Sequence, residues 1–249
     1  MTSNHYSNNQ LHNPDGNGGD ALYNLLPPGP IEFFPYPRVI SVERVIGLDL
    51  GQVHDPTALA ILEISEILIG RSLVTYDPVT IRRASFRHLE RLPLGLDYPT
   101  MVEHVRRVVS RPELSGRTTL VVDATGVGRP VVDLLRRAHL TCRLMPVTIT
   151  AGDRETSDST TWRVPKRDLI TGLLVLLQRE EIDICGHLPA SETLVKELSN
   201  IRIKVSLAGH DTYGAWREGE HDDPVLAAAL ACWRGTKKEP AVIGTRPLL

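Results

Sequence analysis

The sequence predicts an α/β protein with a mixed central sheet flanked by helices. Three strand-like segments come first, and helices and strands then alternate to the end of the chain. Two segments, ERVIGLDL and TTLVVDA, contain short apolar runs typical of strands buried on both faces. The 249 residues can bury a full core, in one large domain or two small ones.

The first half of the chain is expected to form three antiparallel strands behind an N-terminal arm. Residues 1–38 are rich in Asn, Gly and Pro without periodicity, which predicts a flexible arm with a Pro-rich, aromatic docking segment. Alternating or continuous apolar residues then predict strands at 43–50, 57–64 and 72–86. Gly51 to Pro56 form the turn between the first two.

The second half predicts strand–helix units. Apolar residues at helical spacing and helix-start signals such as Pro165 and Pro224 define the helices. A polar loop without periodicity is expected at 150–163. The predicted helices cover 100–109, 126–138, 164–180, 191–201 and 221–233, the strands cover 118–124, 141–150 and 181–184, and a hairpin joins 201–207 to 211–217.

Composition excludes several classes of protein. Cys142, Cys185 and Cys232 are odd in number and far apart, which predicts neither a disulfide framework nor a zinc site. The N-terminus lacks a signal peptide, and the longest apolar stretch, 169–178, is too short to cross a bilayer. We therefore expect a cytoplasmic protein without a membrane partner.

The net charge of −2 does not by itself indicate nucleic-acid binding. Arginines nevertheless gather at 82–91, 106–117 and 136–143. These clusters are compatible with phosphate contacts, and equally with solvated helix faces and strand edges.

Acidic residues end three different predicted elements. Asp49 lies in VIGLDLG, Asp123 in LVVDATGVG, and Asp222 and Asp223 in HDDPVLAAALA. Each has a structural explanation of its own, as a turn or helix cap. Together they predict a cluster, and clustered carboxylates repel one another unless a divalent cation neutralises them. The sequence thus favours a Mg²⁺ or Mn²⁺ site that cuts phosphodiester bonds.

His221 precedes the acidic pair and is a candidate for proton transfer or for contact with the scissile phosphate, although a solvated helix start explains it as well. The GVG after Asp123 allows a tight turn beside a phosphate or metal. It matches neither GxGxxG nor GxxxxGK[ST], so no nucleotide-binding loop is predicted.

In their order and spacing, these motifs resemble the nuclease domain of the large terminase subunit of tailed bacteriophages, a member of the RNase H-like superfamily. The resemblance covers roughly residues 43–235 and rests on VIGLDLGQVHDPTALAI, LVVDATGVGRPVVDLL, MPVTIT, VPKRDLITGLLVLLQ, ASETLVKEL and HDDPVLAAALA. It implies an RNase H-like fold with a mixed five-stranded-type sheet, in which the first and fourth strands are neighbours. In that family the corresponding acids hold two divalent ions, which assigns Asp49, Asp123 and Asp223 as ligands, with Asp222 as the substitute.

The resemblance further implies a DNA endonuclease with a two-metal mechanism. Its domains would be an arm at 1–38, a nuclease domain at 39–236 and a tail at 237–249. The substrate would be double-stranded DNA. The partners would be a separate packaging ATPase, the small terminase subunit and the portal. The protein would work in the host cytoplasm if it is phage-encoded. Unlike a full large terminase, the sequence shows no ATPase motif.

Three other functions remain open from the sequence. A Holliday-junction resolvase of the same superfamily would require a dimer and branched DNA. A sugar-kinase or actin-like phosphotransferase shares a loose likeness to GLDLG and DATGVG, but normally duplicates the domain. In a non-catalytic DNA-binding or assembly protein, the acidic residues would have only a structural role.

Overall fold

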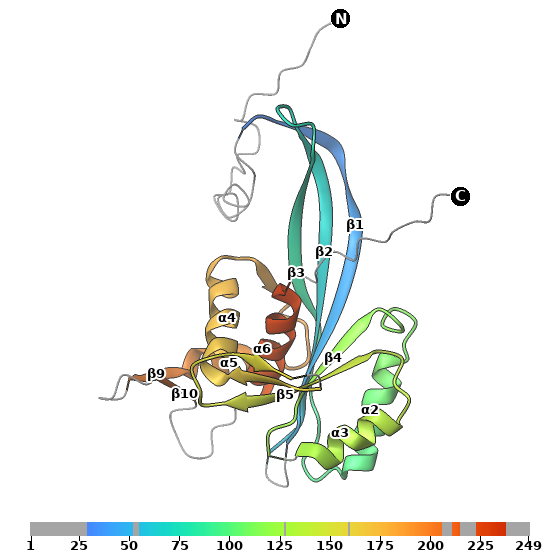
Figure 1. Cartoon of the computed structure of the whole chain (residues 1–249), viewed down its shortest axis with the longest axis vertical. Helices are drawn as coiled ribbons and strands as arrows, with labels where there is room; N and C mark the ends of the chain where they lie inside the picture. The colour runs from blue at the N-terminus through green and yellow to red at the C-terminus, as the bar shows by residue number, and fades with distance from the viewer. Residues whose placement is uncertain are drawn as a thin grey trace, which may run out of the picture.

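A computed structural model describes residues 29–51, 55–126, 128–158, 160–205, 211–214 and 223–237 (Figure 1). The strands are β1 (Ile31–Asp49), β2 (Ala58–Ser72), β3 (Pro78–Arg91), β4 (Thr118–Asp123), β5 (Arg143–Thr150), β6 (Thr156–Ser157), β7 (Trp162–Pro165), β8 (Ile182–Ile184), β9 (Arg202–Val205) and β10 (Asp211–Gly214). The helices are α2 (Tyr98–Val109), α3 (Gly128–Arg137), α4 (Lys166–Gln178), α5 (Ser191–Asn200) and α6 (Asp223–Thr236).

Eight of the strands form one mixed sheet in the order β6-β7-β5-β4-β1-β2-β3-β8. β1, β2 and β3 are antiparallel neighbours, whereas β4 is parallel to β1, and β5 is parallel to β4. The predicted five-stranded core, the mixture of strand directions and the adjacency of the first and fourth strands are confirmed. The short strands β7 and β8 extend the two edges of this core.

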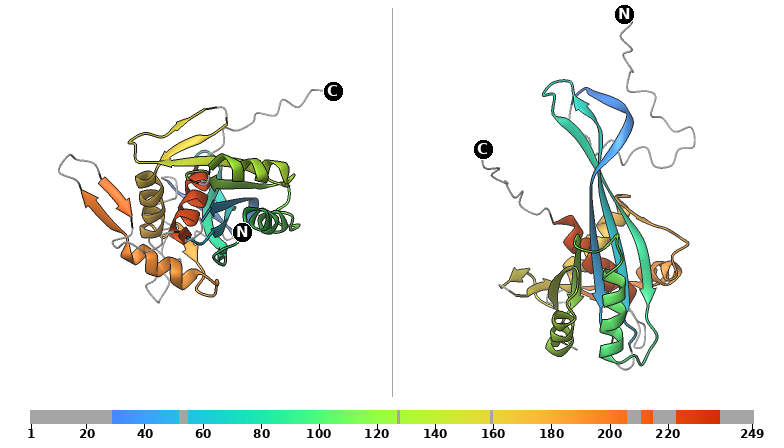
Figure 2. Two further views of the ribbon diagram at one scale, coloured as in Figure 1. Left: turned by 90° about the horizontal axis from the view of Figure 1, so that it is seen from below. Right: turned by 90° about the vertical axis from the view of Figure 1, so that its right-hand side faces the viewer.

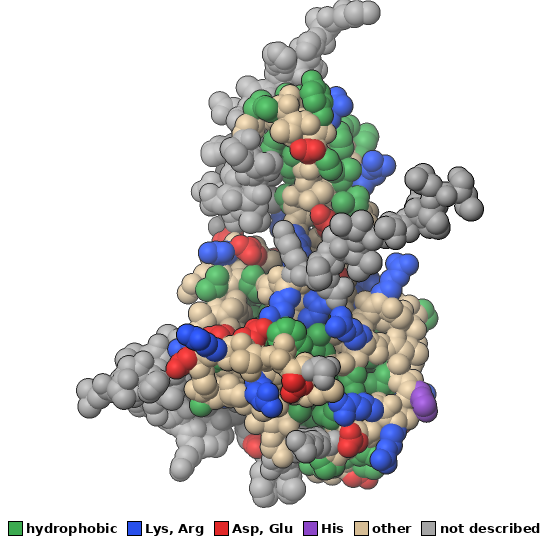
Figure 3. Space-filling model, in the orientation of Figure 1, with side chains coloured by type: hydrophobic (Ala, Val, Ile, Leu, Met, Phe, Trp, Pro, Cys, Tyr) green, Lys and Arg blue, Asp and Glu red, His purple; other side chains and the backbone are tan. Residues whose placement is uncertain are grey.

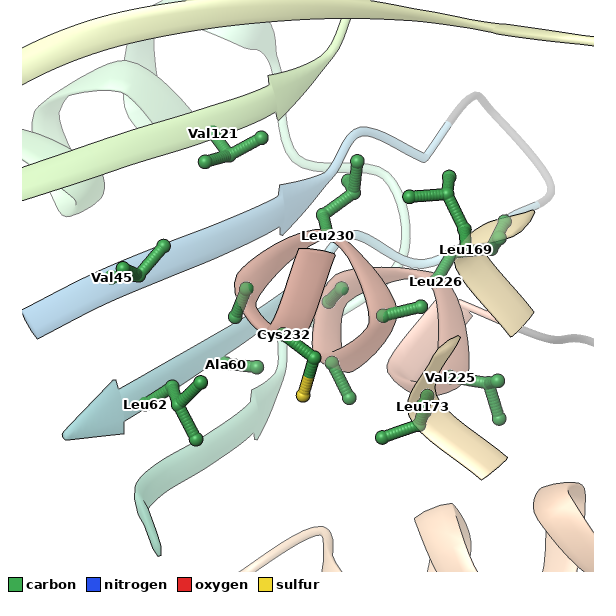
Figure 4. Packing of buried hydrophobic residues seen from close by; sticks show 14 of the residues in the cluster. Val45, Ala60, Leu62, Val121, Leu169, Leu173, Val225, Leu226, Leu230 and Cys232 are labelled. Atoms are coloured by element: carbon green, nitrogen blue, oxygen red, sulfur yellow. The ribbon is translucent and has the colours of Figure 1, made fainter. Parts of the chain in front are cut away.

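Helices cover both faces of the sheet (Figure 2). Alternation along β1 sends Val45 into one apolar core and Ile46 into the other. The first core packs beneath α4, α5 and α6 (Figure 4), and the second beneath α2 and α3. Burial on both faces explains why β1 and β4 have nearly continuous apolar sequences. Within the described residues, no helix is long and apolar enough to cross a membrane.

β1, β2 and β3 run on past the body as a three-stranded arm (Figure 1). Residues 31–38, expected within a flexible segment, instead form the start of β1, while residues 1–28 lie outside the described part. The register slips between Phe33 and Arg38, so the proline-containing stretch makes no regular ladder there. Large apolar side chains are exposed along the arm (Figure 3): Phe33, Tyr36, Val39, Ile40, Leu73, Val74 and Tyr76.

An ion-pair network lies where the arm joins the body. Glu63 on β2 receives hydrogen bonds from Arg44 Nε at 2.9 Å and from Arg87 Nη2 at 2.8 Å. Burial raises the pKa of Glu63, but these two arginines outweigh it and hold the pKa below its usual value. The network ties β1, β2 and β3 together beside the register shift between Ile61 and Leu62.

Several boundary predictions were wrong. β2 runs to Ser72 rather than ending at 64, and the third strand covers Pro78–Arg91 rather than 72–86. A turn follows Ser72, whose Oγ accepts from the Val74 and Thr75 amides, and Tyr76 adopts a positive φ of 61° in this turn. The predicted loop at 150–163 contains β6 and the start of β7. The hairpin of β9 and β10 is confirmed as a separate two-stranded sheet.

Candidate metal centre

Asp49 and Asp123 lie side by side at the carboxyl ends of two parallel strands. The last register pair between β1 and β4 joins Leu48 to Val122, so the two aspartates occupy the next position on each strand. Neighbouring strands are about 4.8 Å apart, which brings both carboxylates within reach of one cation. Both residues are buried, with exposures of 7% and 8%.

The two aspartates also face the same side of the sheet. Asp49 lies two and four residues beyond Gly47 and Val45, and Asp123 lies two residues beyond Val121. Val45 and Val121 both point into the core beneath α6 (Figure 4). Because side chains alternate along a strand, both carboxylates belong to the α6 face.

The backbone after Asp49 is confined by Gly51. Its amide donates to Thr57 Oγ1 at 3.0 Å, and a Cβ at this position would lie 2.0 Å from the Asp55 carbonyl oxygen. Only glycine fits so close an approach. This packing starts β2 at Ala58, directly opposite Asp49.

The turn after β4 orients Asp123. Its Oδ1 accepts from the Thr125 amide at 2.7 Å, and Thr125 Oγ1 accepts from the Ile149 amide at 2.7 Å. Gly126 follows with a φ of 75°, the left-handed conformation that glycine adopts without strain. Thr125 therefore ties one Asp123 oxygen to the turn after β4 and connects that turn to β5.

α6 runs against β1 in the opposite direction. Near the C-terminal end of the helix, Arg234 Nη1 lies 3.5 Å from Glu43 Oε1. About two turns earlier, Ala227 packs on Gly47, where an added Cβ would lie 1.9 Å from the Ala227 carbonyl oxygen. Moving toward the start of the helix therefore means moving toward the carboxyl end of β1.

Asp223 begins α6 and is brought to the aspartate pair by this direction. It lies four residues before Ala227 and so on the same helix face, turned toward the sheet. Only 7% of Asp223 is exposed. Asp223 thus lies toward the same end of the same sheet face as Asp49 and Asp123.

Arg91 is a member of this site that the sequence analysis placed only in a basic cluster. Its Nη2 lies 3.4 Å from Asp223 Oδ2. Arg91 ends β3 and pairs with Ala58, which pairs with Asp49, so all three occupy one row across the sheet. The predicted third strand ended at residue 86, so no strand-end signal marked Arg91; the observed β3 runs on to it. The predicted residues His221 and Asp222 lie outside the described part.

No protein-family model matches the sequence, and no curated protein matches it significantly. Several solved structures, however, are similar to this chain. The large terminase nuclease from thermophilic phage G20c with bound magnesium is similar over 86% of this chain and 95% of its own, with a TM-score of 0.51 and 22% identity. The same nuclease with bound cobalt gives 0.50 at 22% identity and the same coverage. The Thermus phage P74-26 large terminase nuclease domain gives 0.48 at 22% identity, covering 85% of this chain and 92% of its own.

The chain has the fold of a phage large terminase nuclease domain. This fold is RNase H-like, as the sequence analysis predicted. The similarity extends over most of both chains.

The donors in this terminase-nuclease fold suit a hard divalent cation, because all three are carboxylates and such ions prefer oxygen ligands. Among the described residues, however, no three acidic, His or Cys side chains are grouped closely enough to form a complete ligand set. Asp223 is turned to the Arg91 guanidinium at 3.4 Å. Asp49 and Asp123 are adjacent, whereas Asp223 is engaged by arginine.

Proposed function

We propose that the chain is a divalent-metal-dependent endonuclease that hydrolyses phosphodiester bonds of double-stranded DNA. The observation that carries the proposal is the adjacency of Asp49 and Asp123 on one face at the ends of β1 and β4. The magnesium and cobalt in the G20c nuclease, whose fold this chain shares, support the use of a divalent metal.

Asp49, Asp123 and Asp223 would hold two Mg²⁺ or Mn²⁺ ions, with Asp222 as the alternative to Asp223. Such a pair of ions activates water and stabilises the departing 3′ oxygen. The Thr125 amide keeps one Asp123 oxygen fixed, so that this carboxylate is oriented in advance. His221 would move a proton at the attacking water or the leaving oxygen.

Arg91 would moderate the repulsion within the acidic site. A guanidinium beside Asp223 offsets part of the repulsion among buried carboxylates. Beside the acidic residues, the Arg91 guanidinium would also be placed to contact a DNA phosphate, which guanidinium groups bind well.

The domain division and biological setting follow from the same proposal. Residues 39–236 would form the nuclease domain and 237–249 a tail. Residues 1–38 would be the N-terminal arm predicted from the sequence, which is not the three-stranded arm of β1, β2 and β3. The protein would work in the cytoplasm of a phage host, in genome packaging, beside a separate packaging ATPase, the small terminase subunit and the portal.

Plasmid nicking with Mg²⁺, Mn²⁺ or EDTA, without ATP, tests this proposal. Asp49→Asn and Asp123→Asn should abolish cleavage while thermal melts show an intact fold. Asp133→Asn is the matched control, because Asp133 is an exposed aspartate paired with Arg136 on α3, and it should cut at the parent rate. Cleavage by both site variants at the parent rate would refute the metal-site assignment. Preference for a four-way junction over a plasmid would favour the resolvase alternative.

A further inference from the structure

Thr57 is a buried polar residue to which the proposed mechanism gives no role. It lies directly before Ala58, the residue of β2 that pairs with both Asp49 on β1 and Arg91 on β3. Only 4% of Thr57 is exposed. Because an unpaired polar group in a core is costly, a buried hydroxyl is expected to have hydrogen-bond partners. The partners of Thr57 show which parts of the chain it holds.

The Thr57 hydroxyl makes the next contact beyond the ladder between β1 and β2. The last register pair of these two strands is Asp49 with Ala58. Two residues after Asp49, the Gly51 amide donates a hydrogen bond to Thr57 Oγ1 at 3.0 Å. The backbone that carries the Asp49 carboxylate is therefore held by strand pairing at its own position and by a side chain two residues later.

The backbone carbonyl of Thr57 holds the end of the neighbouring strand. It accepts a hydrogen bond from the Leu92 amide at 2.8 Å. Leu92 directly follows Arg91, whose Nη2 lies 3.4 Å from Asp223 Oδ2. Thr57 thus binds the chain just after Asp49 and just after Arg91, although these two residues end different strands.

The hydroxyl hydrogen of Thr57 connects this point to helix α2. Thr57 Oγ1 donates to Met101 Sδ at 3.6 Å, and Met101 lies in the first turn of the helix. Met101 is buried in the same core as Leu50 and Leu92. Because the hydrogen is directed at sulfur, a lone pair of the oxygen remains for the Gly51 amide. A helix on the other face of the sheet therefore orients the oxygen that holds the segment after Asp49.

The packing of this turn does not by itself require a hydroxyl. Gly51 already confines the turn, since an added Cβ would lie 2.0 Å from the Asp55 carbonyl oxygen. Valine in place of Thr57 would have the same shape beside Met101, but it would leave the buried Gly51 amide without this acceptor. The oxygen is therefore needed for the amide and not for filling space.

We propose that Thr57 is a positioning residue for the metal site. Its hydroxyl holds the segment after Asp49 and thereby keeps the Asp49 carboxylate beside that of Asp123. This role rests on the metal-dependent nuclease proposed above. Loss of a partner that orients a metal ligand typically costs about 10–100-fold in metal affinity or activity. Thr57→Val should weaken the binding of a divalent metal by that factor.

Direct metal binding tests this role without cleavage. Mn²⁺ binding to the full chain is followed by the electron paramagnetic resonance signal of free Mn²⁺. Thr57→Val removes the hydroxyl and keeps the side-chain shape, whereas Thr57→Ser keeps the hydroxyl. Thr118→Val is the matched control: Thr118 is also 4% exposed and donates to the Leu114 carbonyl at 2.6 Å, but it lies at the other end of β4 from Asp123. Thermal melts in EDTA measure the stability that each variant loses.

The expected result is a dissociation constant for Mn²⁺ that rises about 10–100-fold in Thr57→Val and stays near that of the parent in Thr57→Ser and Thr118→Val. Nicking should require correspondingly more Mg²⁺ in Thr57→Val alone. Equal Mn²⁺ affinities of the two valine variants, or weak binding by Thr57→Ser, would overturn the positioning role while cleavage by the parent still supports the nuclease.

Failure of the nuclease proposal gives a different result. A parent protein that neither binds Mn²⁺ nor nicks DNA would refute the nuclease, and the positioning role would fall with it. If Thr57→Val does not fold, Thr57→Cys takes its place, because sulfur is a weak acceptor, and Thr118→Cys becomes its control. Equal Mn²⁺ affinities of these two cysteine variants would also overturn the role of the Thr57 hydroxyl.

Discussion

Gly47→Ala should separate α6 from β1 and disable the acidic site. A Cβ on Gly47 would lie 1.9 Å from the Ala227 carbonyl oxygen and 2.9 Å from the Ala231 nitrogen. These neighbours are backbone atoms of a helix, so no side chain can rotate away. Relief to an ordinary contact requires a displacement of about 1.5 Å, and forcing extra atoms into a packed core costs about 1–3 kcal/mol or more.

The free energy of unfolding, from urea denaturation followed by circular dichroism, should fall by about 1–3 kcal/mol or more in Gly47→Ala. Metal-dependent nicking should fall further than stability alone explains, since a displacement of about 1 Å can cost about 100-fold in rate.

Gly172→Ala is the control, because Gly172 lies on the exposed side of α4 with nothing within 4 Å of an added Cβ. Alanine there should stabilise the protein by about 0.4–1 kcal/mol. A Gly47→Ala protein as stable as the parent would refute the backbone contact between α6 and β1.

Glu63→Gln should cost about 1 kcal/mol at pH 7. The pKa of Glu63 is lowered in the folded state, so its contribution is present above the unfolded pKa and disappears as the pH falls through the folded one. The urea midpoints of variant and parent should therefore converge as the pH falls below 4.5, the ordinary value for Glu. A thiol reagent should modify the exposed Cys185 in the native protein and the buried Cys232 only after unfolding, as mass spectrometry of labelled peptides can show. Nicking assays should find Asp223→Ala inactive and Asp222→Ala largely active; the reverse order would move the ligand to the other aspartate.

The sequence was sufficient to find Asp49 and Asp123 because each follows an apolar run that can only be a buried strand. Their shared face also follows from alternation once the two strands are neighbours. Sequence reasoning did not place Arg91, because its partner Asp223 is distant in the chain and comes near only through the packing of α6 on β1.

The start of β1 was missed for a different reason. Prolines and aromatic residues in 31–38 are typical of an irregular segment, and the strand tolerates them only beside a register slip in the arm. The short strands β6 and β7 were missed because two to four residues carry too little periodicity to show in a polar stretch. β7 is a strand because it pairs with β5, and not because its own residues favour a strand.

β1 joins two distant parts of the protein in one continuous strand, from the exposed arm at Ile31 to the buried carboxylate of Asp49. At about 3.3 Å per residue this strand is a rod roughly 60 Å long. If its pairing were uninterrupted, a strand of this length would transmit a pull on its tip to the acidic site. The register slips between Phe33 and Ser41 interrupt it near the tip, whereas Glu43 to Asp49 keep unbroken pairing with β2. Mechanical load on the arm should therefore be absorbed as twist at the slips, leaving the aspartate at the far end undisturbed.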